Sequence, residues 1–265
     1  MKHAMKEQWD RISAENAFFG VLSLSDYERV ENVDVAQFWE SGRESVESFM
    51  KLLRFDNPES CHMLEIGCGL GRMTHHFSNI FGSVCAVDVS QEMLSKAQSY
   101  WGHLKNVDWM LGNGESLQPI ADESVDFVFS FLVLQHIPDP NAVINYIRET
   151  ERVLKKNGIA LLQFRVMPPH AGLTQVKYNI FSHCPAPATK ALIWMWDALQ
   201  GNVGVRAKFA REYEAWRGCA LRTSAIEAAA AKAHLQIIRT ERLGKQSPGT
   251  ESRYYIFEKT GGLQS

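Results

Sequence analysis

Short apolar runs alternate with amphipathic stretches along most of the chain. The runs are rich in Val, Ile and Phe, a composition typical of buried strands. The stretches between them place apolar residues at near-helical spacing, which predicts helices packed on a sheet. Strands that alternate with helices in this way form mostly parallel α/β sheets with helices on both faces. The predicted strands are residues 61–66, 84–89, 107–111, 125–133, 159–166, 235–241 and 253–258.

Several predicted helices carry recognisable end signals. Ser90 precedes a helix that runs to Tyr100, and Thr223 precedes a helix over 224–234; both residue types are good N-caps. The helix that begins near Asn141 is expected to end at residues 155–158, where two lysines and a glycine suit a helix C-terminus. We therefore expect helix boundaries close to these positions.

Two regions depart from the alternation. Residues 1–55 predict N-terminal helices, because aromatic and aliphatic residues recur there at near-helical spacing. Residues 168–222 form a long excursion, in which 188–199 and 206–216 favour helices. A connection this long inside a compact domain is usually functional, so we expect a helical cap insertion over a binding site. The chain thus divides into an N-terminal helical segment, 1–55, and a main unit, 56–265.

Composition narrows the possible partners. The chain has 265 residues, which fits one domain with an insertion, and 28 Lys plus Arg against 30 Asp plus Glu give a net charge of −2. That balance leaves no basic footprint for nucleic acid or an anionic membrane. No apolar run approaches the ~18 residues of a membrane span, and the polar N-terminus does not resemble a signal peptide. The five cysteines favour free thiols. We expect a cytoplasmic protein and predict no oligomeric state.

The first strand ends in three glycines, Gly67, Gly69 and Gly71. Glycine tolerates positive φ and lets a ligand approach the backbone closely. The segment 73–81 is helix-compatible, and the N–H groups at a helix start suit an electron-rich ligand group. The spacing is G-x-G-x-G, whereas dinucleotide folds use G-x-G-x-x-G, and no G-x-x-x-x-G-K-[ST] is present. The pattern favours a nucleoside ligand without phosphate.

An acidic residue ends the second strand. Asp88 lies seventeen residues after Gly71. A carboxylate there could accept hydrogen bonds from both hydroxyls of a ribose. It could also cap the next helix, but Ser90 is better placed for that role.

Five segments together resemble the successive motifs of the class I S-adenosylmethionine-dependent methyltransferases: residues 64–72, 86–90, 112–115, 124–130 and 153–158. They follow the family's order and spacing over about residues 60–166. The resemblance implies a Rossmann-like, seven-stranded sheet of order 3-2-1-4-5-7-6 with the last strand antiparallel. It makes residues 56–265 a methyltransferase domain that uses S-adenosyl-L-methionine and releases S-adenosyl-L-homocysteine.

The resemblance also implies the cofactor contacts. The glycine motif would lie against the methionine part and the ribose, Asp88 would bind the ribose, and Val89 and Met93 would flank the adenine. Asn113 stands where many members have an aspartate, and its carbonyl could accept the same bond from the adenine amino group. Arg72 or Arg43 could pair with the cofactor carboxylate, and the sequence leaves both open. The implied set is Arg43, Glu65, Gly67, Gly69, Gly71, Arg72, Asp88, Val89, Met93, Asn113, Gly114, Glu115 and Phe131.

The acceptor side has fewer signals. His136 follows the strand 125–133 directly, so it is expected near the carboxyl ends of the strands, where open α/β sheets bind ligands. It could act as a general base, contact the acceptor, or simply be held by the backbone. Gln135 is a second candidate for acceptor contact. His170, Tyr178 and His183 are further candidates in the excursion, whereas His75 and His76 are expected to pack or face solvent.

Missing motifs narrow the reaction. The strand 125–133 is not followed by the Asn/Asp-Pro-Pro-aromatic element of adenine and cytosine amino-methylases, nor by the metal-binding Asp-Asp-Asn cluster of catechol-type enzymes. We therefore predict metal-free methyl transfer to O or N of a small organic acceptor. Two alternatives stay open: an NAD(P)-dependent oxidoreductase, against which the glycine spacing argues, and a non-catalytic protein that binds S-adenosylmethionine. Transfer of another group from the same sulfonium is a related option.

Overall fold

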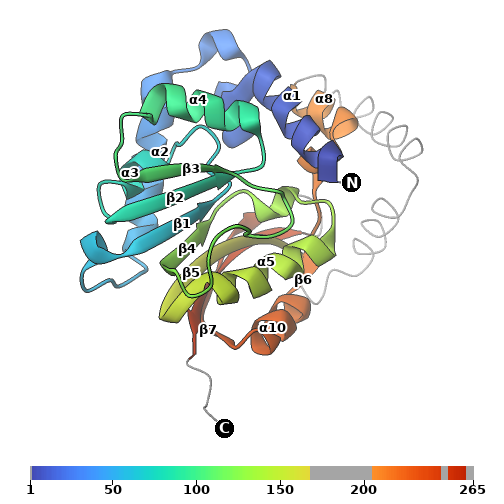
Figure 1. The fold of residues 1–265 in the computed structure, drawn as a ribbon. Coiled ribbons are helices and arrows are strands. Elements are labelled where there is room, and N and C mark those ends of the chain that lie inside the picture. The colour runs from blue at the N-terminus through green and yellow to red at the C-terminus, as the bar shows by residue number, and fades with distance from the viewer. Residues whose placement is uncertain (1, 168–204, 246–249, 261–265) are drawn as a thin grey trace.

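A single mixed sheet forms the centre of the molecule (Figure 1). The computed structural model describes residues 2–167, 205–245 and 250–260. The strand order is β3-β2-β1-β4-β5-β8-β7, and β8 runs antiparallel to both β5 and β7. This confirms the expected order and the antiparallel last strand; a two-residue strand, β6, is added beside β5. The strands are β1 (His62–Ile66), β2 (Ser83–Asp88), β3 (Val107–Leu111), β4 (Val125–Ser130), β5 (Leu154–Met167), β6 (Leu221–Arg222), β7 (Leu235–Lys245) and β8 (Glu251–Lys259).

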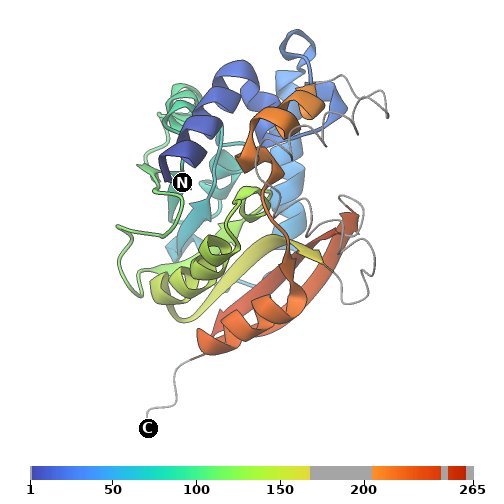
Figure 2. The same ribbon diagram turned by 90° about the vertical axis from the view of Figure 1, so that its right-hand side faces the viewer.

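Helices cover both faces of the sheet (Figures 1 and 2). Consecutive strand residues point to opposite faces. Leu64 and Val128 therefore pack in one cluster with α5 and α10, whereas Met63 and Phe127 pack in another with α2, α3 and α4. The helices are α1 (Lys2–Val21), α2 (Val35–Met50), α3 (Thr74–Phe77), α4 (Gln91–Trp101), α5 (Pro140–Val153), α8 (Val205–Glu212), α9 (Glu214–Arg217) and α10 (Thr223–Lys232). Short 3₁₀ turns lie at Ser25–Tyr27 (η1), Val30–Asn32 (η2), Pro58–Ser60 (η3) and Leu134–His136 (η4).

The N-terminal helix α1 lies above the sheet in Figure 1, between α4 and α8. It packs against α4 and α9, and Figures 1 and 2 show it beside α8. A break at Asn16 interrupts it, where φ is −161° and ψ is 89°. The Asn16 Oδ1 accepts from Phe19 N at 3.0 Å and its Nδ2 donates to Tyr27 O at 2.9 Å, so one side chain caps the second part of the helix and holds the following turn.

Some element boundaries differ from the predicted ones. The strand predicted over 125–133 ends at Ser130, because Leu132 adopts a φ of 62° and its N–H donates to the Gln163 side chain at 2.9 Å. Strand β5 begins at Leu154, so residues 155–158 lie in a strand and do not end a helix. Ser90 is confirmed as an N-cap, since its Oγ accepts from Met93 N at 3.1 Å. Thr223 is not one: α10 begins at Thr223, and Arg222 precedes it without a side-chain cap.

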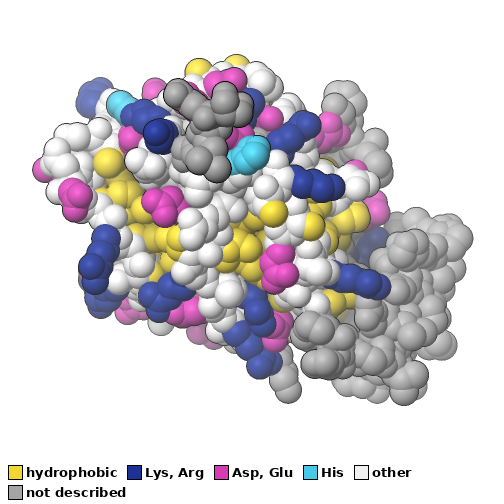
Figure 3. Space-filling view, turned by 90° about the horizontal axis from the view of Figure 1, so that it is seen from below, with side chains coloured by type: hydrophobic (Ala, Val, Ile, Leu, Met, Phe, Trp, Pro, Cys, Tyr) yellow, Lys and Arg dark blue, Asp and Glu magenta, His cyan; other side chains and the backbone are white. Residues whose placement is uncertain are grey.

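The surface mixes charges of both signs. On the face drawn in Figure 3, Lys and Arg side chains alternate with Asp and Glu around exposed apolar residues. Within the described part of the chain, no helix is long and apolar enough to cross a membrane. The same residues hold no group of three or more His, Cys, Asp or Glu side chains arranged to bind a metal ion.

Candidate functional site

A pocket opens at the carboxyl ends of β1, β2 and β4, beneath α1. It encloses about 890 Å³ of empty space, part of which is open to solvent. Its floor is the glycine turn after β1, and Asp88 stands at the end of β2. Ligands of open α/β sheets bind at this edge of the sheet.

Backbone hydrogen bonds fix the glycine turn to β2. The N–H groups of Gly67 and Cys68 both donate to Val87 O, at 2.7 and 3.0 Å. The Asp88 carboxylate accepts from Gly69 N at 2.8 Å and from Ser90 N at 2.9 Å. Burial raises the pKa of Asp88, and these backbone bonds oppose that effect. Each carboxylate oxygen still has lone-pair capacity for a ligand hydroxyl.

Two members of the glycine motif support the turn from behind and are not among the residues that line the pocket. Gly71 has a φ of 77°, and a Cβ on it would lie 2.8 Å from Trp101 and 2.9 Å from Trp109. Its missing side chain therefore lets two aromatic rings pack under the turn. Glu65 is buried, accepts from Thr74 Oγ1 at 2.6 Å, and has its pKa raised to about 7 by burial.

The two candidate arginines occupy different surroundings. Arg72 lines the pocket, is 3% exposed, and donates from Nη1 to Ser41 Oγ at 3.2 Å and Ser45 Oγ at 3.3 Å. Its buried Nε has no hydrogen-bond partner among the described residues. Burial lowers the pKa of Arg72 to about 10, so the group stays charged at neutral pH. Arg43 is 44% exposed, pairs with Glu40 and Glu47, and does not line the pocket.

The loop after β3 borders the pocket through Gly112 and Gly114. Asn113 and Glu115 border an adjoining cavity of about 520 Å³ instead. The side-chain oxygen Oδ1 of Asn113 accepts from the backbone N–H groups of Glu115 and Ser116, both at 2.8 Å. That oxygen is therefore engaged in a local turn, and one of its lone pairs would have to serve an adenine amino group in addition.

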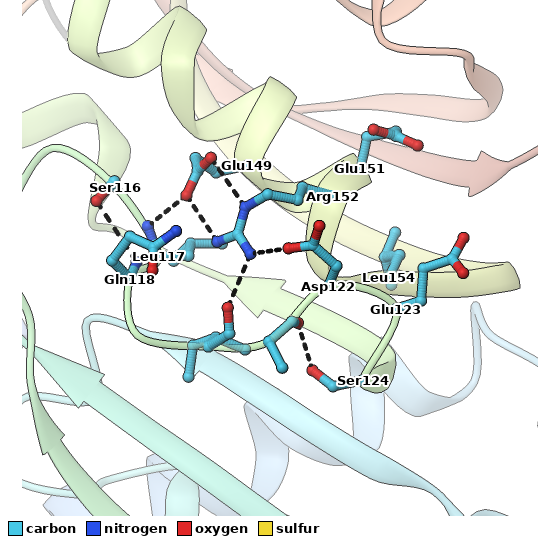
Figure 4. Close-up of polar contacts among 12 residues, drawn as sticks. Ser116, Leu117, Gln118, Asp122, Glu123, Ser124, Glu149, Glu151, Arg152 and Leu154 are labelled. Atoms are coloured by element: carbon cyan, nitrogen blue, oxygen red, sulfur yellow. Dashed lines mark hydrogen bonds and ion pairs between the residues drawn. The ribbon is translucent and has the colours of Figure 1, made fainter.

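Helix α5 holds this loop in place. Asn145 Nδ2 donates to Glu115 O at 2.7 Å, and the Glu149 carboxylate accepts from Leu117 N at 3.0 Å. Figure 4 shows Arg152 between Glu149 and Asp122, with N···O distances of 2.8 and 2.6 Å. These bonds tie residues 115–122 to the helix and so position the glycines at the pocket.

The opposite side of the pocket is a largely apolar surface of Phe131, Leu132, Val133, His136 and Ile137. We term it the acceptor wall, after the role proposed for it below. Trp9 of α1 meets the His136 ring edge-on, with centroids 5.4 Å apart, and Trp216 of α9 lies 5.6 Å from it. His136 Nδ1 lies 3.0 Å from Trp216 O. Burial, followed by the charge of Arg165, lowers the pKa of His136 to about 4, so the ring is neutral at pH 7.

Comparisons with known proteins agree with this geometry. Residues 64–162 match the family model described as a methyltransferase domain. Over 157 residues, the chain is 31% identical to the malonyl-[acyl-carrier protein] O-methyltransferase of Hahella chejuensis, covering 54% of each chain. It is 34% identical over 82 residues to the phosphoethanolamine N-methyltransferase of Triticum aestivum, covering 31% of this chain and 16% of that one.

Solved structures show the same fold. The geranyl diphosphate C-methyltransferase of Streptomyces coelicolor, solved with S-adenosyl-L-homocysteine, superposes with a TM-score of 0.58 at 14% identity over 92% of this chain and 88% of that one. The YcgJ protein of Bacillus subtilis gives a TM-score of 0.56 at 19% identity over 83% and 99%. Residues 64–162 form a class I S-adenosylmethionine-dependent methyltransferase domain. The chain spans about half or less of the length of the curated relatives named above.

The methyltransferase domain brings most of the predicted cofactor residues together. Those that line the main pocket are Gly67, Gly69, Arg72, Asp88, Val89, Met93, Gly114 and Phe131, together with His136. Gln135 is buried behind the acceptor wall, and Arg43, Glu65, Gly71, Asn113 and Glu115 lie outside the lining. His170, Tyr178 and His183 lie outside the described residues.

The sequence did not predict every pocket residue. Met5, Trp9, Gly20 and Val21 of α1 line the pocket, as does Tyr146 of α5. Trp9 belongs to the near-helical spacing of apolar residues that predicted the N-terminal helices, and only the packing of α1 on the sheet reveals that it also lines the pocket. Tyr146 carried no motif at all.

Proposed function

We propose that this protein transfers the methyl group of S-adenosyl-L-methionine to O or N of a small organic acceptor. The observation that carries the proposal is that a buried carboxylate, Asp88, and a buried guanidinium, Arg72, line one pocket with a glycine turn on its floor. A ligand with ribose hydroxyls at one end and a carboxylate at the other suits both groups. The cofactor has that chemistry and carries no phosphate.

Each part of the cofactor can be assigned to residues of the pocket. Asp88 would accept from the ribose hydroxyls, and Arg72, whose Nε has no partner among the described residues, would donate to the carboxylate. Val89 and Met93 would pack on the adenine, and the backbone of Gly67 and Gly69 would lie against the ribose and the methionine part. Arg43 is the weaker candidate, because its guanidinium is already shared by Glu40 and Glu47.

Bound cofactor supplies an electrophilic methyl group on a sulfonium, and the protein's task is alignment of the acceptor. Positioning of this kind contributes about 7–11 kcal/mol in well-oriented systems. The acceptor wall and Trp9 would hold the acceptor by apolar contact. A ring with a pKa of about 4 is a weak base, so His136 is better suited to contact than to proton removal. Acceptors that need little deprotonation, such as a carboxylate or a free amine, fit that environment.

Transfer of labelled methyl groups tests this proposal. The protein would be incubated with S-adenosylmethionine labelled in the methyl group and with pools of small carboxylates and amines; the names of the relatives favour including both classes. Label in a small-molecule product supports methyl transfer. Saturable S-adenosylhomocysteine binding without label transfer to any acceptor would favour the non-catalytic alternative.

A further inference from the structure

A chain of buried side-chain hydrogen bonds runs behind the acceptor wall. Gln163 of β5 is 0% exposed. Its Oε1 accepts from Leu132 N at 2.9 Å, and its Nε2 donates to Ser252 Oγ at 2.8 Å and to Gln135 Oε1 at 3.1 Å. Gln135 Nε2 lies 3.1 Å from His136 Nε2. The chain ends where His136 Nδ1 meets Trp216 O at 3.0 Å.

The first end of the chain fixes the direction of every bond. A backbone N–H can only donate, so the atom of Gln163 that faces Leu132 must be the carbonyl oxygen. The amide nitrogen of Gln163 then faces Gln135, whose nearer atom must be its own oxygen. This turns the Gln135 amide nitrogen, a donor, toward His136. His136 Nε2 must therefore be the unprotonated, accepting nitrogen.

The second end gives the same answer independently. The Trp216 carbonyl can only accept, so His136 Nδ1 must carry the proton. The Leu132 N–H and the Trp216 carbonyl, at opposite ends of this series of hydrogen bonds, are thus both compatible only with the Nδ1–H tautomer of His136. Inverting any amide between them would set two donors or two acceptors face to face in a buried site, which is costly.

From this agreement we infer that Gln163 is a positioning residue: it orients Gln135 and thereby holds His136 in the acceptor wall as the neutral Nδ1–H tautomer. The inference rests on the proposed function only in that this wall faces the acceptor. It deepens that proposal, because the one ring nitrogen able to take a proton already accepts a hydrogen bond from Gln135. His136 is then a fixed, neutral surface for the acceptor and not its base.

The surroundings of the ring favour the same state. Trp9 of α1 and Trp216 of α9 present aromatic rings to it. The charged group acting on it from β5 is Arg165, whose guanidinium donates to Arg217 O at 2.5 Å. A positive neighbour disfavours an imidazolium.

Nitrogen NMR on the wild-type protein tests the inference directly. With ¹⁵N-labelled histidine, and the His136 signals assigned by their loss in His136→Phe, the two ring nitrogens report which one carries the proton. The expected result at pH 7 is a single neutral ring protonated at Nδ1. A ring protonated at Nε2, or an imidazolium, would overturn it.

Two variants separate positioning from packing. Gln163→Met keeps the side-chain volume but removes the amide oxygen and nitrogen, so Gln135 loses the bond to its Oε1 that fixes which way its amide faces. The Gln135 oxygen can then turn toward His136 Nε2, which favours a proton on that nitrogen in competition with the Trp216 carbonyl at Nδ1, and a population protonated at Nε2 should emerge. Ser252→Ala removes another bond of the same amide and leaves Gln163 anchored at Leu132 and Gln135, so its spectrum should match wild type. The same His136 spectrum in Gln163→Met and Ser252→Ala, whether it matches the wild type or not, would contradict the inference. S-adenosylhomocysteine affinity in Ser252→Ala should match that of the wild type; loss of that binding in the wild type would instead count against the proposed function.

Discussion

Arg72 and Arg43 show how little of a residue's role its type determines. Arg72 is buried at the pocket, whereas Arg43 is shared by two glutamates on the surface of α2. The sequence left both open as partners of the cofactor carboxylate. Burial and the unpartnered Nε of Arg72 favour that residue.

A pair of ligands distinguishes the two arginines. Arg72→Met should weaken S-adenosylhomocysteine binding by about 1–3 kcal/mol, as for a lost charged hydrogen bond. It should leave the affinity for 5′-methylthioadenosine, which lacks the amino-acid part, unchanged. Arg43→Met is the matched control and should alter neither affinity. Calorimetric titration of both variants with both ligands measures the four affinities. An equal loss of affinity for both ligands in Arg72→Met would contradict the assignment of Arg72 to the cofactor carboxylate.

His136 gives a prediction with a pH dependence. Burial lowers its pKa to about 4, below the ordinary histidine value of about 6.5. His136 therefore does not change charge between pH 6 and pH 9, and turnover should show no step from this residue in that range. His136→Ala should lower turnover through lost acceptor contact while S-adenosylhomocysteine affinity stays nearly intact. A wild-type step near pH 6.5 that disappears in His136→Ala would restore the general-base role.

At the scale of elements, α5 positions the loop after β3 through the Arg152 cluster (Figure 4). Arg152→Ala should lower the free energy of unfolding by about 1–3 kcal/mol, because it leaves Glu149 buried without its cation. Lys155→Ala, which breaks a more exposed pair with Asp126, should cost less than about 1 kcal/mol. Urea denaturation of both variants measures the difference, and similar losses would show that the Arg152 cluster is no more than a surface pair.

The same cluster sets the direction of a pH effect. Arg152, through its hydrogen bonds, is the largest influence that lowers the pKa of Glu149. The stabilisation from ionised Glu149 is therefore present above the unfolded carboxyl pKa of about 4.3 and is lost as pH falls through the lower folded value. The gap between wild type and Arg152→Ala should narrow in acid. A gap that is constant with pH would exclude this linkage.

The alternation of strands and helices was predicted from the sequence, because local residues determine buried strands and amphipathic helices; the order of the strands in the sheet came from the resemblance to the methyltransferase family. Ser90 and the strand Val107–Leu111 lie where the pattern predicted them. The end of β4 did not, because it depends on a bond from Leu132 N, in the turn after β4, to Gln163 of β5, which is distant in the sequence. Local patterns contain no information about such a partner.

The whole molecule explains why the pocket was predicted only in part. Helix α1 lies at the start of the chain but covers the carboxyl ends of strands that follow much later. Asp10 accepts from Ser90 Oγ at 2.6 Å, and Gln8 accepts from Ala215 N at 2.9 Å, so α1 links the segment after β2 to α9. Trp9 and Gly20 enter the site through that docking, which depends on contacts distant in sequence.

The central claim is that the pocket binds the S-adenosyl group, and calorimetric titration with S-adenosylhomocysteine tests it most directly. We predict saturable binding to the wild type, none of NADH, and a loss of about 1–3 kcal/mol in Asp88→Ala. Asp126→Ala removes a carboxylate at the opposite end of the sheet, where it accepts from His62 N at 2.8 Å, and should bind like wild type. Binding of NADH without S-adenosylhomocysteine, or an affinity unchanged in Asp88→Ala, would contradict the account.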